Sequence, residues 1–196
     1  MAQHYENHHY VQKIKKIPLL ENDEEYVLAK QWRDHNDAKA IEKLISSHLR
    51  LVLKVANGYR GYGLPLSDLI AEGNLGMMQA IKHYDPEKGF RFATYASWWI
   101  RANINEYVLQ SWSLVKMGTT KKKKKLFFSL RRTEQALEAE EESKHLEHGL
   151  TQEKAKKIAN KLDVSEEEVF LMHQRLSGRD HSLNAPVGSD DQDSEW

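Results

Sequence analysis

The sequence contains no cysteine, and only four prolines and ten glycines interrupt its 196 residues. The absence of cysteine excludes disulfide scaffolds and thiolate zinc sites, and it favours a reducing, cytoplasmic location. No apolar run reaches the roughly 18 residues that a membrane span requires. The polar first ten residues also lack the apolar segment of a signal peptide. We therefore expect a cytoplasmic protein without a membrane anchor.

The formal net charge is zero, but the charges are unevenly distributed. Residues 1–132 contain 22 Lys and Arg against 13 Asp and Glu, a charge of +9, whereas residues 133–196 contain 7 against 16, a charge of −9. A basic part with a short aromatic-rich stretch is typical of nucleic-acid binding. The alternative is a chance distribution of solvated charges.

Most of the chain shows the apolar spacing of helices, and no stretch alternates as a β-strand does. The fold is predicted to be all-α, with helices near residues 22–35, 37–58, 66–84, 92–113, 120–143, 151–161 and 165–177. Helix caps are expected at Ser67 or Asp68, at Thr151 and at Ser165. The polar N-terminus, with its histidines, is expected to be a solvated tail. The acidic segment after Gly178 is expected to be extended.

The segment from Thr94 to Leu109 divides into two faces at 100° per residue. The predicted core stripe contains Ala96, Ile100, Ile104 and Tyr107. The opposite face contains Tyr95, Trp98, Trp99, Arg101, Ala102 and Asn105. Aromatic rings stack on unpaired bases and arginine neutralises phosphate, so this face predicts contact with single-stranded nucleic acid. The alternative is that another helix covers the rings.

The preceding helical segment divides in the same way. Its predicted core stripe contains Leu69, Gly73, Met77, Ala80 and Ile81, with the glycines allowing close helix approach. Opposite lie Asp68, Glu72, Leu75, Met78 and Gln79, with Asn74 at the edge. An apolar centre inside a charged rim is typical of a protein-binding surface, and an ordinary solvated face is the alternative. Because no nucleophile or metal ligand is spaced to join the carboxylates, we expect neither an enzyme nor a metal site.

Two long motifs resemble those of sigma-70-family transcription initiation factors. The run DLIAEGNLGMMQAIKHYDPEKGFRFATYASWWIRANINEYV holds almost every position of the motifs D-L-I-x-E-G-N-x-G-x-M and K-G-[FY]-x-F-x-T-Y-A-x-W-W-I-R. Upstream, SHLRLVLKVANGYRGYG fits the helix and loop that precede them. Downstream, EYVLQSWSLVKMGTT and KKLFFSLRR resemble the heat-shock members. The resemblance extends from about residue 10 to residue 196.

The resemblance implies a sigma factor architecture. Regions 1.2 and 2 would form a helical bundle over residues 1–115, region 3 a small three-helix domain over 116–178, and residues 179–196 the start of the acidic region 3.2 linker. The sequence is expected to lack region 4, which reads the −35 element. The implied function is non-enzymatic and needs no cofactor. The resemblance implies that the protein binds the β′ clamp helices of core RNA polymerase. It also implies that the protein recognises and opens the −10 element of heat-shock promoters.

The resemblance also assigns roles to residues. Core polymerase would contact Asp68, Glu72, Asn74, Leu75, Met78 and Gln79. The non-template strand of promoter DNA would contact His48, Arg50, Leu51, Arg91, Phe92, Tyr95, Trp98, Trp99, Arg101, Asn105, Thr120, Lys121 and Lys123. Within that set, Trp98 and Trp99 would meet the upstream edge of the opened duplex, and Phe92 and Tyr95 would hold a flipped base.

Several points remain open. Ala102 and Asn105 replace a glutamine and a threonine of housekeeping sigma factors, which predicts a different promoter sequence. The lysines after Thr120 could instead be a solvated helix start. Chaperones and a regulatory protease are open as further partners. Two rival functions are a polymerase-independent module that binds single-stranded nucleic acid, and a truncated sigma factor that acts as an inhibitory decoy.

Overall fold

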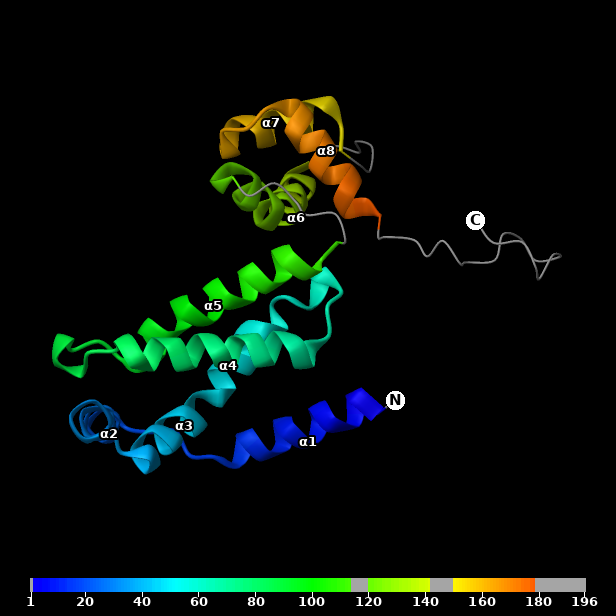
Figure 1. The fold of residues 1–196 in the computed structure, drawn as a ribbon. Coiled ribbons are helices and arrows are strands. Elements are labelled where there is room, and N and C mark those ends of the chain that lie inside the picture. The colour runs from blue at the N-terminus through cyan, green and yellow to red at the C-terminus, as the bar shows by residue number, and fades with distance from the viewer. Residues whose placement is uncertain (1, 114–119, 142–149, 179–196) are drawn as a thin grey trace. The chain divides into compact units, whose positions relative to one another are not determined.

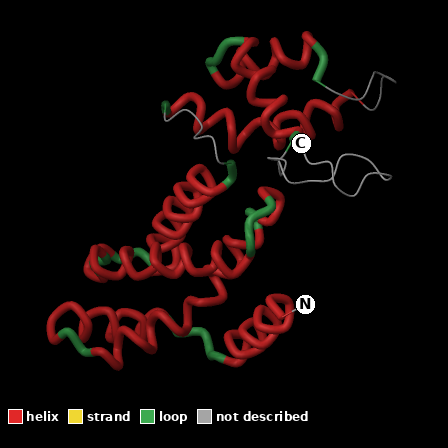
Figure 2. Tube along the Cα trace, turned by 45° about the vertical axis from the view of Figure 1, so that its right-hand side comes forward, coloured by secondary structure: helices red, strands yellow, loops and turns green. Residues whose placement is uncertain are grey.

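The computed structural model describes residues 2–113, 120–141 and 150–178, and the chain divides into two compact units, Met1–Trp112 and Ser113–Trp196. Every regular element in the described part is a helix, which confirms the all-α prediction (Figures 1 and 2). The first unit contains α1 Ala2–Lys16, α2 Asn22–His35, α3 Ala38–Asn57, α4 Leu66–His83 and α5 Phe92–Ser111, with short 3₁₀ turns Arg60–Tyr62 and Pro86–Lys88. The second unit contains α6 Lys121–Glu141, α7 Gln152–Leu162 and α8 Glu166–Ser177. The acidic tail predicted after Gly178 lies outside the described residues.

The predicted N-terminal tail is wrong, because α1 is a helix over Ala2–Lys16. Its packing depends on a few apolar residues near its end. Ile14 is buried, and Tyr10 and Ile17, on the same helical stripe, are half-buried. The helix packs on α3 and α4. The short apolar stripe at its end therefore decides the conformation of a segment that is otherwise polar.

Helices α4 and α5 form the closest pair in the first unit and run side by side in Figure 1. Two glycines of α4 permit this approach. A Cβ atom on Gly76 would lie 2.7 Å from the carbonyl oxygen of Trp99, and one on Gly73 would lie 2.6 Å from Cγ1 of Val52. The predicted core stripe of α4 is confirmed, since Leu69, Gly73, Met77, Ala80 and Ile81 are buried, and that of α5 is confirmed at Ala96, Ile100 and Ile104. The prediction for Tyr107 is wrong, because its ring is half-buried with its hydroxyl on Asp68, and Val108 is the buried residue at the end of the stripe.

Helix caps were predicted correctly in the second unit but not in the first. Thr151 accepts a hydrogen bond from the Lys154 nitrogen, and Ser165 forms a capping box with Glu168. In contrast, α4 begins at Leu66 after Pro65, without a side-chain cap. Ser67 instead donates a hydrogen bond to Asp68 at 3.0 Å. The three helices of the second unit enclose a core of Leu126, Phe127, Leu130, Ala155, Ile158 and Val169.

Candidate nucleic-acid and polymerase interfaces

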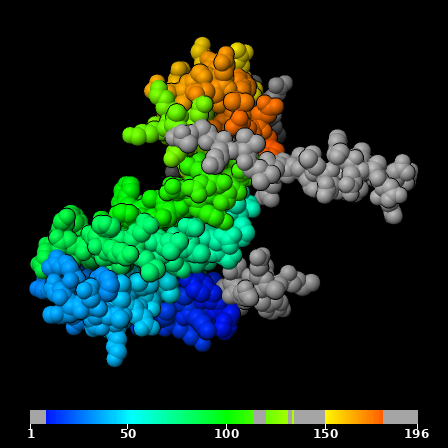
Figure 3. All heavy atoms as spheres, in the orientation of Figure 1, coloured from blue at the N-terminus to red at the C-terminus, as the bar shows by residue number. Residues whose placement is uncertain are grey.

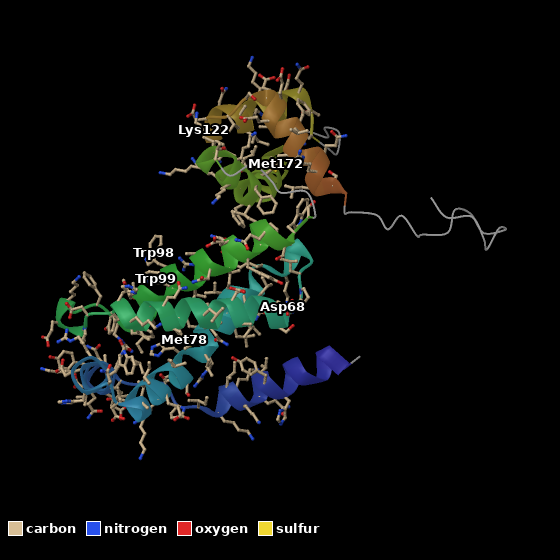
Figure 4. All side chains as sticks on the ribbon, in the orientation of Figure 1. Asp68, Met78, Trp98, Trp99, Lys122 and Met172 are labelled. Atoms are coloured by element: carbon tan, nitrogen blue, oxygen red, sulfur yellow. The ribbon has the colours of Figure 1, made fainter. Side chains whose placement is uncertain are left out.

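The aromatic face of α5, which comprises Tyr95, Trp98, Trp99 and Arg101, lies at the surface of the first unit. Trp98 is 70% exposed and projects away from α5 (Figure 4). The Arg101 guanidinium lies 5.9 Å from the centre of the Trp98 ring, a cation–π contact. A free indole beside a cation offers a stacking surface and a phosphate partner together. No described helix covers Trp98, so the alternative that this ring is a core residue is wrong.

The two tryptophans differ in their surroundings. Trp99 is half-buried, and its ring stacks on His83 with centroids 5.2 Å apart and planes 10° apart. Tyr95 meets the Trp99 ring at 6.4 Å and 63°. The Trp99 ring therefore has neighbours from both α4 and α5. Asn105, further along α5, is half-buried, and its side-chain oxygen is enclosed.

A buried carboxylate lies where sequence analysis expected DNA contacts. Glu25 of α2 is 1% exposed. Its Oε2 accepts hydrogen bonds from Arg91 Nε at 3.1 Å and Nη2 at 3.0 Å, and it lies 3.6 Å from Nε2 of His48. Its Oε1 accepts a hydrogen bond from the Phe92 backbone nitrogen at 2.6 Å. Arg91 and His48 therefore share an internal anion in this structure.

The environment of Glu25 determines its protonation. Burial alone raises the pKa of the carboxyl group, but hydrogen bonds from His48, Arg91 and the Phe92 nitrogen outweigh it and lower the pKa to about 2. The pKa of Arg91 is raised, mainly by its hydrogen bond and charge interaction with Glu25. At neutral pH the cluster therefore contains a carboxylate and a guanidinium.

Sequence analysis missed Glu25, although α2 carries a signal. Its inward positions are Glu25, Leu28, Ala29 and Trp32, so one acidic residue lies on an apolar stripe. A charge on such a stripe indicates a buried partner of opposite charge. The sequence alone does not identify that partner, because Arg91 is 66 residues away.

The prediction for Phe92 needs correction. Its side chain has no exposed surface, and its ring packs edge-on against His48 at 5.0 Å and Tyr84 at 5.2 Å. It is the first residue of α5 and faces the core together with Ala96. The accessible ring is Phe90, which is 68% exposed and whose carbonyl oxygen accepts a hydrogen bond from the Tyr84 hydroxyl at 2.6 Å. The missed signal is that Phe92, four residues before Ala96, continues the apolar stripe of α5, whereas Phe90 does not lie on that stripe.

The other predicted DNA contacts occupy mixed positions. Arg50 is half-buried and donates a hydrogen bond from Nη2 to the carbonyl oxygen of Ile17, and Leu51 is also half-buried. In the second unit, Thr120 and Lys121 are exposed. Lys123 lies 3.9 Å from a Glu168 oxygen. Its neighbour Lys122 contacts Asp163 at 2.8 Å, so part of the basic run is paired within the unit.

The polymerase-binding candidates lie on α4, and two of them form an exposed apolar pair. Leu75 is 51% exposed and Met78 is 47% exposed. Figure 3 shows the atoms of α4 and α5 at the surface on the visible face. Exposed Gln79 and half-buried Glu72 supply polar groups on the same helix. This arrangement combines apolar area with polar groups that can orient a partner.

Hydrogen bonds connect the polar residues of α4 to α5. The Tyr107 hydroxyl donates to Oδ2 of Asp68 at 3.1 Å, and Nδ2 of Asn103 donates to Oε1 of Gln79 at 3.1 Å. Asn74 is half-buried beside Tyr10 of α1. Asp68 and Gln79 are thus held by hydrogen bonds from α5, whereas Leu75 and Met78 are exposed.

The described residues contain no group of three or more His, Asp or Glu side chains that could hold a metal ion. No described helix is long and apolar enough to cross a membrane.

Comparison with protein families identifies two matching regions. The family model for sigma-70 region 2 matches residues 44–113, and that for sigma-70 factor region 1.2 matches residues 8–38. Together these segments include α2, most of α3, and all of α4 and α5, and so both candidate surfaces and Glu25.

Curated relatives match most of the chain. RNA polymerase sigma factor RpoH of Caulobacter vibrioides is 54% identical over 187 residues, 95% of this chain and 61% of the relative. RpoH of Rhizobium radiobacter is 54% identical over 188 residues, with the same coverage. RNA polymerase sigma-C factor of Myxococcus xanthus is 46% identical over 181 residues, 92% of this chain and 59% of the relative. The chain spans about three fifths of the length of these relatives.

Proposed function

Because the chain belongs to the sigma-70 family of RNA polymerase sigma factors, we propose that it binds core RNA polymerase and directs promoter-specific initiation at heat-shock promoters. The observation that carries this proposal is the pairing of two exposed surfaces on adjacent helices. One is the apolar pair Leu75 and Met78 on α4, and the other is the aromatic face of α5. A factor that recruits polymerase to DNA needs one surface for each partner. The RpoH names of the relatives support the heat-shock assignment.

Leu75 and Met78 provide the apolar centre of the polymerase contact, and Asp68, Glu72, Asn74 and Gln79 provide polar contacts around it. The β′ clamp helices are the proposed partner. Burial of two half-exposed side chains contributes affinity, and the polar groups fix the register of the two proteins. The hydrogen bonds from Tyr107 to Asp68 and from Asn103 to Gln79 orient two of these groups before binding.

The aromatic face of α5 captures the non-template strand of the −10 element. Trp98 and Trp99 meet the edge of the opened duplex, and Tyr95 with Phe90 holds an extruded base. Each ring that stacks on a base is worth about 1–3 kcal/mol, which offsets the few kcal/mol lost by unstacking that base. Arg101, beside Trp98, neutralises a phosphate.

The first test is binding to purified core RNA polymerase from a bacterium that carries one of the close relatives. The wild-type chain is expected to bind, and the double variant Glu72→Lys, Met78→Ala is expected to lose most of that binding. The matched control is Glu24→Lys, Val27→Ala on α2, which makes the same kinds of change at exposed positions. Circular dichroism spectra of all three proteins check that the fold is retained.

The outcomes separate the rival functions. If the wild-type chain fails to bind polymerase but binds −10 single strands, the polymerase-independent module is the better account. If it binds polymerase but the complex fails to open promoter DNA and blocks another sigma factor, the inhibitory decoy is favoured. Binding that leads to transcription from a heat-shock promoter supports the proposed function.

A further inference from the structure

His83, the last residue of α4, is exposed, yet two contacts fix the position of its side chain. Its imidazole lies parallel to the Trp99 indole, with ring centroids 5.2 Å apart and planes 10° apart. Nδ1 of the same imidazole lies 3.0 Å from the carbonyl oxygen of Gln79, one turn earlier in α4. The helix therefore fixes the imidazole, and the imidazole contacts a ring of α5.

The contacts of Trp99 show how the His83 ring restricts the orientation of the indole. Tyr95 packs against the edge of the indole, and the backbone oxygen of Trp99 accepts a hydrogen bond from Asn103 at 3.2 Å. The stack with His83 adds a contact across the face of the ring, which opposes rotation of the indole about its side-chain bonds. The neighbouring Trp98, at 70% exposure, is in a much more open environment.

We propose that His83 is a positioning residue for promoter opening, which holds the Trp99 indole in the orientation that receives the edge of the opened duplex. This inference rests on the proposed function. A ring that is already oriented loses less conformational freedom when a base pair stacks on it, so the stacking energy is retained. Because His83 lies on α4 and Trp99 on α5, the contact also depends on the close approach of these helices at Gly76.

Two variants separate the aromatic contact from the other properties of histidine. His83→Ala removes the ring, whereas His83→Phe keeps a ring for stacking but removes the nitrogen atoms and any charge. His35→Ala is the matched control, because His35 is also exposed and also ends its helix, α2. All variants are made in the full chain.

The ring contact is measured first in the free chain, by ¹⁹F NMR with 5-fluorotryptophan. The Trp99 resonance is assigned from its absence in Trp99→Phe. We expect it to shift and broaden in His83→Ala, and to remain sharp in His83→Phe and in His35→Ala. An unchanged Trp99 resonance in His83→Ala overturns the proposal, whether or not the chain binds polymerase.

Promoter opening is then measured by permanganate reactivity of −10 thymines, with the chain bound to core polymerase at saturation. His83→Ala is expected to lower the equilibrium constant for opening, calculated from the open fraction, about threefold to tenfold, the factor that corresponds to one aromatic pair, with unchanged affinity for polymerase. His83→Phe is expected to restore opening. Wild-type opening by His83→Ala, or an equal loss in His83→Phe, overturns the positioning role. A wild-type chain that neither binds polymerase nor opens DNA contradicts the proposed function instead, and the NMR result still decides whether the ring contact exists.

Discussion

The carboxylate of Glu25 lies 2.6 Å from the backbone nitrogen of Phe92 and caps the first turn of the aromatic helix from 67 residues away. The N-cap residue Arg91 makes no side-chain cap hydrogen bond of its own. Its side chain instead binds the same carboxylate. Since the first turn of a helix favours negative charge, Glu25 stabilises the start of α5 and orients it relative to α2.

Replacement of Glu25 by glutamine is expected to lower the free energy of unfolding by about 2–3 kcal/mol at pH 7. The pKa of Glu25 is about 2 in the folded protein, against 4.5 for an unperturbed glutamate. Its charge therefore contributes stability above pH 4.5, and this contribution is lost as the pH falls from about 4.5 to 2. Urea unfolding of both proteins between pH 7 and pH 3.5 measures the difference.

The control for this substitution is Glu24→Gln, because Glu24 is the exposed neighbour of Glu25 in the same helical turn. Its unfolding free energy is expected to stay within about 0.5 kcal/mol of wild type at every pH. If the difference between wild type and Glu25→Gln is the same at pH 7 and pH 3.5, the ionised carboxylate is not the source of the stability.

The glycines of α4 predict unequal effects of two similar substitutions. Gly76→Ala places a methyl group 2.7 Å from the Trp99 carbonyl oxygen and 3.0 Å from Cα of Ile100, both backbone atoms. The helices must separate, so we expect a loss of about 2–3 kcal/mol in unfolding free energy. Gly73→Ala meets mainly the Val52 side chain, which can shift, and should cost less. Thermal unfolding of the two variants tests this order, and equal or reversed losses would contradict it.

Periodicity was sufficient to predict α2 to α8 and most of the core stripes of α4 and α5, because packing at those helices follows a regular apolar stripe. It placed Tyr107 in the core, where the structure has Val108. It failed for α1, whose first residues are polar and whose packing depends on Ile14. The Glu25–Arg91 pair could not be predicted, because a contact between distant residues of opposite charge leaves no periodic pattern. The accessibility of Phe90 rather than Phe92 depends on where α5 begins, and helix boundaries are weakly encoded.

Phe90 and Phe92 are expected to have opposite roles in stability and binding. Phe92→Ala removes a fully buried ring and should lower the unfolding free energy by about 3–5 kcal/mol. Phe90→Ala removes an exposed ring and should leave stability within about 0.5 kcal/mol of wild type. If Phe90 stacks on a base, its loss weakens binding of −10 single strands by the polymerase complex. Urea unfolding and fluorescence anisotropy of a labelled oligonucleotide measure the two effects. A stable Phe92→Ala variant would contradict the burial of that ring.

Trp98 provides the most direct test of the aromatic face, because its exposure separates binding from folding. Trp98→Ala should leave the unfolding midpoint unchanged and weaken binding of a −10 single strand to the polymerase complex by about 1–3 kcal/mol, roughly fivefold to more than a hundredfold. Leu19→Ala is the control, since Leu19 is 69% exposed in the same unit but lies outside the aromatic face.

The weakening caused by Trp98→Ala should persist at high salt, because stacking is screened less than phosphate contacts. In contrast, loss of Arg101 should matter most at low salt. Anisotropy titrations at two salt concentrations decide between these contributions. Equal binding by wild type and Trp98→Ala at both concentrations would show that the exposed indole does not contact the strand.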